Sequence, residues 1–396
     1  MELKLNIDSV IFDEFVRSRV SHYGQLSSFG EIKKFQEKYN YTLCGLYEND
    51  ELVGTFVLLT KRFLYIKFAY IPYGPCMDYS EYNINEFTRL LKDYGNKNHI
   101  DFFRVDPFVE VSHPEVTEYM KNAGFKHRGY TYGYVGSFTN RHTLIIDIEP
   151  SYEEIFKNFT GSRRRKINRQ KDNVISYRLA DKEEVSVMCY LENFLAVEKG
   201  FKPHSEEFFK KYMDLYKDNY VYLIVSIDID ETINNTNKKL KEADEEKTVA
   251  RLNKELNNLN ELKNKYGSKA DIACCLFLYL NDYCWDLYSY KNSDFDFLPT
   301  IDFIHVYTIQ EMKKRNVKKY DMVGFSGFTN KDDPYYGLYE YKTSFGSKIV
   351  EYIGQFDLEI KKGSAAKFHR YYTDIYRTAI RKFNSIKSKL KNHEKR

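Results

Sequence analysis

The sequence has 396 residues, enough for two compact domains with a sizeable core, and 42% of its residues are apolar and 17% aromatic. Its 61 Lys and Arg nearly balance its 57 Asp and Glu, so the net charge of +4 predicts no partner by itself, and any anion site has to come from local clustering. The six cysteines show neither a CxxC pair nor Cys/His metal spacing, and neither a signal peptide nor a membrane-spanning run is present, so we expect reduced thiols, no metal and a cytoplasmic protein.

Three short apolar runs occupy residues 42–70, with the sequences TLCGLY, LVGTFVLLT and FLYIKFAY. Turn-like segments separate them, which predicts an antiparallel meander of β-strands. A helix is expected from about residue 84 to residue 96, followed by a strand in DFFRVDP. A strand, a helix and a second strand on one sheet give an α/β layout.

The second half of the chain repeats this plan. Strands are predicted in DIACCLFLYL and WDLYSYK, a helix in IDFIHVYTIQEMKKR and a strand in YDMV. Asp101 and Asp321 stand 220 residues apart, and so do Phe125 and Phe345, although two landmarks can share an offset by chance. We therefore expect two related domains, residues 1–145 and residues 146–396.

A charged segment without proline, residues 231–266, interrupts the second half between two predicted strands. Leu252, Leu256 and Leu259 lie at three-and-four spacing within it, which suits the thin seam of an antiparallel helical hairpin, or coiled-coil arm. A disordered insertion is the alternative, because the KEADEEK stretch is highly charged. The strands on both sides favour the hairpin, since they bring its ends together.

Residues 364–390 predict an amphipathic helix. Phe368, Tyr372 and Ile375 begin its apolar face, and Lys and Arg occupy the opposite face. Such a helix docks on its own domain or lies on an anionic bilayer, and docking is the commoner use of such a stripe.

The strongest basic cluster lies in GSRRRKINRQKD, on a helix expected to begin near residue 151. Its positive charges are concentrated over about two helical turns. Arginine forks match phosphate oxygens, so the cluster suits a phosphate of RNA or of a lipid-linked pyrophosphate. The alternative is an ordinary solvated helix face. The cluster consists of Arg163, Arg164, Arg165, Lys166 and Arg169.

Several reaction classes leave no trace in the sequence. It has no P-loop, no GxGxxG after a strand, no HExxH and no GxSxG. The acetyltransferase α/β fold transfers an acyl group to an amine without a covalent intermediate, and the strand, helix, strand order suits it. The glycine-rich loop that holds coenzyme A in that fold is missing.

Five blocks of the sequence resemble the FemA, FemB, FemX and MurM family, in family order and over nearly the whole chain. They are GQLSSFGEIK, AYIPYGPCMDY, FFRVDP, SRRRKINRQKD and YYGLYEYKTSFGSKIVEYIGQFDL, of which the last is the most specific. The resemblance implies two acetyltransferase-like domains in tandem, with a helical-hairpin arm inserted in the second. It also implies transfer of an aminoacyl group from aminoacyl-tRNA to the side-chain amine of the stem peptide of a peptidoglycan precursor, either lipid II or its soluble nucleotide precursor. No cofactor is implied, and contact with the inner face of the membrane would be peripheral.

This reaction needs little nucleophilic help from the protein. The ester on the tRNA is already activated, but an amine with a lysine-like pKa of about 10.4 is protonated at neutral pH, and freeing its lone pair costs roughly 4 to 5 kcal/mol. Negative charge then develops on the ester carbonyl and on the departing ribose oxygen. A fixed cation beside these atoms would stabilise that charge.

The resemblance assigns residues to these tasks. Lys342 corresponds to the family lysine thought to be that cation, with Tyr341 as its aromatic neighbour, whereas the residues alone predict an exposed helix lysine. Lys33 corresponds to the lysine that contacts the precursor's phosphates. His204 and Phe208 stand where an Arg and a Tyr usually grip the precursor, so that grip is expected to differ. Tyr73, Asp106 and Tyr288 would line the same groove, or serve only packing and loop-capping roles.

Two other functions fit parts of the sequence. A coenzyme A dependent N-acyltransferase would keep the fold and change the donor, but the missing glycine-rich loop argues against it. A non-catalytic RNA-binding or cell-wall scaffold protein would use the hairpin and the basic cluster alone.

Overall fold

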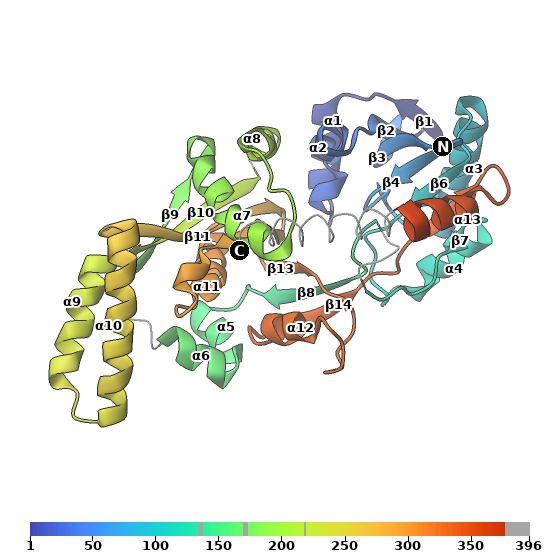
Figure 1. Ribbon diagram of the computed structural model, residues 1–396. Coiled ribbons are helices and arrows are strands. Elements are labelled where there is room, and N and C mark those ends of the chain that lie inside the picture. The colour runs from blue at the N-terminus through green and yellow to red at the C-terminus, as the bar shows by residue number, and fades with distance from the viewer. Residues whose placement is uncertain (134–137, 169–172, 218, 377–396) are drawn as a thin grey trace.

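Two β-sheets form the framework of the protein, and each is covered by helices on both faces (Figure 1). The computed structural model describes residues 1–396 except 134–137, 169–172, 218 and 377–396. Within these residues the first sheet has the order β1-β2-β3-β4-β6-β15-β7, with β5 beside β3. Its strands are β1 (Glu2–Leu5), β2 (Asn40–Glu48), β3 (Glu51–Phe63), β4 (Ile66–Ile71), β5 (Cys76–Met77), β6 (Phe102–Val105), β7 (Lys126–His127) and β15 (Phe356–Glu359).

The second sheet has the order β14-β8-β13-β12-β11-β10-β9. Its one parallel pair is β12 with β13, just as β4 with β6 is the one parallel pair of the first sheet among the described strands. Each pair is joined through a helix, α3 in the first half and α11 in the second. The strands are β8 (His142–Asp147), β9 (Ile175–Ala180), β10 (Tyr220–Asp228), β11 (Lys269–Leu280), β12 (Tyr283–Lys291), β13 (Lys319–Gly324) and β14 (Lys348–Glu351).

The predicted meander and the repeated plan are therefore present. A meander precedes the helix and the parallel strand in each half. Of the two landmark pairs, Asp101 and Asp321 do not correspond, because Asp101 precedes β6 whereas Asp321 lies within β13. Phe125 and Phe345 do correspond: both are buried, and they lie shortly before β7 and β14, the strands at the equivalent ends of the two sheets.

Helices pack on both faces of each sheet. In the first half α3 (Glu81–Asn98) and α4 (Pro114–Asn122) cover one face, and α1 (Ser9–Arg17) and α2 (Ser27–Glu37) lie on the other. In the second half α5 (Tyr152–Asn158) and α11 (Thr300–Lys314) cover one face, and α7 (Val185–Lys199) and α8 (Glu206–Leu215) lie on the other. Side chains of α1, α2, α7 and α8 share one core, which joins the two halves.

The expected division after residue 145 does not follow the sheets. It cuts through β8, and β15, from the far end of the chain, lies beside β6 in the first sheet. The buried Arg104 side chain donates from Nε and Nη2 to the Asp357 carboxylate on β15, at 2.8 and 3.0 Å. Phe356 and Leu358 complete the first core from the same strand. The C-terminal strand thus belongs to the first sheet.

The basic segment is not one helix from residue 151. α5 ends at Asn158 and α6 (Gly161–Asn168) begins two residues after the buried Phe159, whose backbone is extended at φ −65° and ψ 146°. Burial of that ring forces the turn, so the basic side chains lie on a separate short helix.

Between β10 and β11 the chain forms α9 (Ile229–Glu242) and α10 (Glu246–Tyr266), which lie side by side and extend away from the first sheet (Figure 1). Leu252, Leu256, Leu259 and Leu262 are the buried residues of α10. Leu259 and Leu262 also belong to the core of the second half. The base of this helix pair is therefore packed on the domain.

The described part of the C-terminal region, α13 (Ser364–Phe368) and η4 (His369–Tyr376), lies on the first sheet. The Phe368 ring centroid is 4.5 Å from that of Phe68, and the Tyr372 centroid is 5.0 Å from that of Phe63. Residues 377–390 of the predicted helix lie outside the described residues. Along the described chain, no helix is long and apolar enough to cross a membrane.

Candidate functional site

The parallel strands β12 and β13 pair only over residues 283–285 and 319–321. Beyond that point β12 continues beside β11 alone, and β13 pairs with β8. We call the place where the pairing ends the second junction. It lies at the carboxyl ends of two parallel strands joined by a crossover helix, which is where α/β sheets commonly bind ligands.

Lys342 reaches the second junction from α12 (Tyr336–Thr343). Its side chain is half-buried, and Nζ donates to the carbonyl oxygens of Val323 at 2.9 Å and Gly324 at 3.0 Å. An ammonium group has three N–H donors, and within the described residues no third partner takes the last one. The expectation of an exposed helix lysine is wrong, because this nitrogen is held against the end of β13.

Two acidic side chains flank this ammonium, Asp286 on β12 and Asp321 on β13. Burial lowers the pKa of Lys342 to about 8, and the attraction of the two carboxylates opposes that shift. Burial also raises the pKa of Asp321 to about 6 and raises that of Asp286. One cation and two acids thus share a poorly solvated site, where charges interact strongly.

Tyr341 points away from Lys342, toward α11. Its hydroxyl donates to Asp302 Oδ1 at 3.1 Å, and Arg163 donates to both oxygens of the same carboxylate at 2.8 and 2.7 Å. Arg163 Nε also donates to Ser344 Oγ at 2.9 Å, just after α12. Asp302 is buried, so this network ties α6, α11 and α12 together and fixes the helix that carries Lys342.

The basic cluster divides into two sets. Arg163 is turned inward against the Tyr341 ring, with its side chain 12% exposed, so its expected role on phosphate is replaced by the pair with Asp302. Arg164 donates to the carbonyl oxygens of Lys157 and Phe159 at the end of α5. Arg165 and Lys166 are exposed, although the Lys166 ammonium also lies 3.7 Å from Asp302 Oδ2. Arg169 lies outside the described residues.

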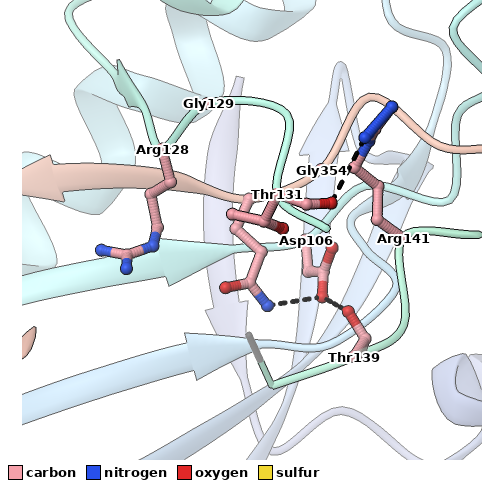
Figure 2. A pocket seen from close by; sticks show the side chains of 8 residues that line it. Asp106, Arg128, Gly129, Thr131, Thr139, Arg141 and Gly354 are labelled. Atoms are coloured by element: carbon pink, nitrogen blue, oxygen red, sulfur yellow. Dashed lines mark hydrogen bonds between the residues drawn. The ribbon is translucent and has the colours of Figure 1, made fainter. Parts of the chain in front are cut away.

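The first sheet has an equivalent place, the first junction, where the pairing of β4 with β6 ends at Ile71 and Val105. Asp106 follows directly and is buried. Its Oδ2 accepts from Thr139 Oγ1, from Gln355 Nε2 at 3.1 Å and from Tyr70 Oη at 3.3 Å; Figure 2 shows the first two of these bonds. Burial raises the pKa of Asp106. This carboxylate lines a small pocket next to the returning C-terminal strand.

Lys33, on α2, lies at a cavity of about 160 Å³ in the first half. Its ammonium pairs with Glu37 and lies 5.3 Å from the centre of the Phe29 ring. The cavity reaches Tyr70, which connects it to Asp106. Its lining residues are Lys33, Glu37, Tyr39, Leu59, Tyr70, Phe138 and Tyr372.

Tyr73 follows β4 and adopts a left-handed backbone, with φ 52°, which is uncommon for a residue with a side chain. The conformation places its ring against His22, with ring centroids 3.6 Å apart, and beside Phe29 at 6.2 Å. Burial raises the pKa of Tyr73, and the charges of Asp106 and Asp321 raise it further. Tyr73 therefore lies between the two junctions.

His204, Phe208 and Tyr288 form one aromatic cluster in the second half. The His204 ring is stacked on Phe208 at 4.1 Å, and the Tyr288 ring is 5.6 Å from that of His204. Glu192, fully buried, accepts from His204 Nδ1 at 2.6 Å and from the His204 backbone N–H at 2.8 Å. This carboxylate fixes the histidine ring, which is still partly exposed.

The structure does not gather the predicted residues in one pocket. Lys33 and Asp106 line two separate pockets. Tyr73 lies where the halves meet, and the His204 cluster lies near α2, since Gln36 donates to Tyr212 at 3.4 Å beside Tyr288. Tyr341 and Arg163 contact Asp302 on α11 instead. The sequence analysis missed Asp286 and Asp321, although an Asp inside an apolar strand is a signal for a buried polar group with a task. Within the described ranges, no three His, Cys, Asp or Glu side chains gather to hold a metal ion.

Comparison with known proteins decides the family. The FemAB family matches residues 7–249 and 230–372, which together cover most of the chain. The chain belongs to the FemAB family. Its relatives include the lipid II:glycine glycyltransferase of Staphylococcus epidermidis, 25% identical over 89% of this chain and 92% of that protein, and aminoacyltransferase FemA of Staphylococcus aureus, 23% identical over 90% and 95%. This FemAB protein is thus an acyl-transferring enzyme.

Solved structures agree on the fold of this FemAB protein. A crystal structure of FemX aligns with 93% of this chain and 100% of its own, with a TM-score of 0.80 and 21% identity. L-PGS from Bacillus licheniformis aligns with 93% of this chain and 96% of its own, with a TM-score of 0.50 and 10% identity. The fold is a tandem of two acetyltransferase-like domains, as the sequence predicted.

Proposed function

We propose that this FemAB protein transfers an aminoacyl group from aminoacyl-tRNA to the side-chain amine of the stem peptide of a peptidoglycan precursor, and so builds the interpeptide bridge. The relatives named lipid II:glycine glycyltransferase and aminoacyltransferase FemA support this acceptor and this reaction. The observation that carries the proposal is the Lys342 ammonium, anchored by two carbonyl oxygens with one N–H to spare.

The spare donor fits the charge that the reaction develops. When the amine attacks the ester, negative charge forms on the carbonyl oxygen, and it then moves to the ribose oxygen as the ester bond breaks. A fixed ammonium at hydrogen-bond distance stabilises both, and one such donor is worth about 100- to 1,000-fold in rate. With its pKa lowered to about 8, Lys342 is still mostly protonated at neutral pH.

The two substrates approach from different sides in this proposal. The acceptor binds where the halves meet, near Tyr73 and the His204 cluster, with Lys33 and Asp106 in the pockets of the first half. The tRNA approaches the side of the second sheet that carries α6 and α12, where Arg165 and Lys166 are exposed. The ester then meets the amine at the second junction, beside Lys342.

Purified protein incubated with lipid II and separately charged Gly-, Ala- and Ser-tRNA tests the proposal. Mass spectrometry of the muropeptide should show an added amino acid from at least one donor, and tRNA binding should weaken steeply with salt. Absence of product from all three donors, with lipid II and with the soluble precursor, would overturn it.

Two further measurements distinguish the proposed function from its two alternatives. Acetyl-CoA in place of charged tRNA should give no acetylated product, and acetylation would instead favour a coenzyme A dependent enzyme. Lys342→Met should bind charged tRNA and transfer little. Salt-sensitive tRNA binding by the unaltered protein without any product would favour a non-catalytic RNA-binding scaffold.

A further inference from the structure

The acceptor ammonium must lose a proton before it can attack, and Lys342 is itself a cation that cannot take it. A second group near the same place is therefore required, with an unoccupied basic atom. The following inference rests on the proposed function and concerns that group.

Asp321 has such an atom. Its Oδ1 accepts from Thr143 Oγ1 and from the Val323 backbone N–H, the latter at 2.7 Å, and these bonds fix the carboxylate at the end of β13. Oδ2 has no donor among the described residues, although the residue is only 4% exposed. Oδ2 is not one of the fully buried atoms without a partner, so it is open to water or to a ligand.

The surroundings of Asp321 point toward the acceptor. Its negative charge raises the pKa of Tyr23 and Tyr73 in the first half. It also raises the pKa of Tyr352, whose backbone forms an isolated β-bridge with Glu110 of the first half. Among the described residues Asp286 has hydrogen bonds only from the second half, from Ser289 and Tyr320. Asp321 thus lies between Lys342 and side chains of the first half. The titratable groups that face it are Lys342, Asp286, Cys284, Tyr23, Tyr73 and Tyr352.

The other nearby groups are poorer bases. Asp106 Oδ2 accepts three hydrogen bonds and its Oδ1 has no donor among the described residues, but Asp106 lies at the first junction and is not among the charges that act on Lys342. His22 Nδ1 accepts from the Gly24 N–H at 3.0 Å, so its hydrogen is on Nε2 and neither nitrogen has a free lone pair.

We infer that Asp321 binds the ammonium group of the acceptor through Oδ2 and accepts its proton, which makes it the proton acceptor of the transfer. The free amine then forms its bond to the ester carbonyl carbon, and the bond from that carbon to the ribose oxygen breaks. The second proton of the amine goes to the ribose oxygen, with Lys342 beside it. Asp321 afterwards releases its proton to solvent, so one proton leaves per amide formed.

The electrostatics support this assignment. Burial raises the pKa of Asp321 to about 6, which makes it a stronger base than an ordinary aspartate, while it is still ionised at neutral pH. Below that pH the carboxylate is protonated and cannot accept a proton, so kcat/KM for the acceptor, which reports the free enzyme, should fall with a midpoint of about pH 6.

The test compares Asp321→Asn with Asp286→Asn, on two acceptors. One acceptor is the natural precursor, and the other carries an aminooxy group in place of the amine, which is already neutral at pH 7. On the natural acceptor, Asp321→Asn should lower kcat by about 100- to 10,000-fold and lose the acid limb of the pH profile, with the KM for charged tRNA nearly unchanged. On the aminooxy acceptor most of that loss should disappear.

Asp286→Asn is the matched control, because it removes the same charge beside the same lysine. The ratio of its kcat on the natural acceptor to its kcat on the aminooxy acceptor should equal that of the unaltered protein. Asp321→Glu, which restores a carboxylate, should recover part of the rate and the acid limb. The kinetics of a variant are compared only if its thermal unfolding is cooperative, like that of the unaltered protein.

Three results would overturn the inference: an unchanged acid limb in Asp321→Asn, equal losses on both acceptors, or a glutamate variant no better than asparagine. An unaltered protein that transfers nothing would instead count against the proposed function. The two failures are therefore distinguishable.

Discussion

The two halves of this protein place the same feature, the carboxyl ends of a parallel strand pair, in different surroundings. At the first junction β15 lies beside β6, and Asp106 is enclosed by Thr139, Gln355 and Tyr70 (Figure 2). At the second junction β13 pairs with β8, and one N–H of Lys342 and the Oδ2 atom of Asp321 have no hydrogen-bond partner among the described residues.

The comparison shows how one fold gives two different sites. The strand order is shared, so topology alone does not make a junction reactive. Among the described residues the difference lies in what completes the parallel pair: a returning strand beside a carboxylate whose Oδ2 accepts three hydrogen bonds, or a lysine anchored on backbone carbonyls. We expect catalysis at the second junction and acceptor binding around the first.

Replacing Lys342 should have the largest effect of the changes that test this difference between the two junctions. Lys342→Met keeps the length of the side chain and removes its charge, so kcat should fall about 100- to 1,000-fold while the KM for the acceptor changes little. Steady-state kinetics with charged tRNA would measure both.

Lys348→Met is the matched control, since Lys348 is exposed on β14 and loses the same charge. It should retain nearly full activity. Similar losses in the two variants would mean that general charge, and not the second junction, determines the rate.

The sequence predicted the strands well because alternation and turns are local signals, and the FemAB blocks led to Lys342. It did not reveal that β15 joins the first sheet, since the Arg104 to Asp357 pair spans 253 residues. Nor did it distinguish Arg163 from its basic neighbours, because the partner that turns it inward, Asp302, lies 139 residues away. Asp286 and Asp321 come from different strands, and only the register of β12 with β13 brings them together.

The second test concerns the network that holds α12. Asp302→Ala leaves the Arg163 guanidinium buried without its carboxylate and removes the partner of the Tyr341 hydroxyl, so we expect a loss of about 3 kcal/mol in the free energy of unfolding. Urea denaturation followed by circular dichroism would measure it.

Asp296→Ala is the matched control, because Asp296 pairs with Lys291 at the surface, where side chains are 55% and 41% exposed. Its effect should stay below about 1 kcal/mol. If Asp302→Ala were equally mild, the network would not be what fixes the helix that carries Lys342.

The third test uses the pH dependence of stability. The folded-state pKa of Asp321, about 6, lies above its ordinary value of 3.8, so the protonated form stabilises the fold below about pH 4, and this contribution is lost as the pH rises through 6. Asp321→Asn stays neutral, so it should be more stable than the unaltered protein by about 2 to 3 kcal/mol near pH 8 and nearly equal to it near pH 4.

Unfolding at several pH values would check this, and a stability gain that did not shrink at low pH would contradict the shifted pKa. Together with a loss of activity, the gain would show that the second junction keeps an unfavourable charge for function, which is common at active sites.

The smallest effect is expected on the surface of the second half where we propose that tRNA binds. Arg165 and Lys166 are exposed on α6, the helix whose inward-facing Arg163 is tied to Asp302. Each phosphate contact releases counterions, so Arg165→Gln with Lys166→Gln should weaken tRNA binding and lower the slope of log affinity against log salt by about 1 to 2. Fluorescence anisotropy over a range of salt concentrations would measure that slope.

Lys92→Gln with Lys97→Gln removes two charges from exposed positions of α3 in the first half and serves as the control. It changes the net charge equally, so a purely global attraction would lower both slopes alike. A slope lowered only by the α6 pair would place a phosphate of the tRNA on the side of the second sheet that carries α12. The donor would then approach Lys342 from one side of the sheet, and the acceptor would reach Asp321 from the other.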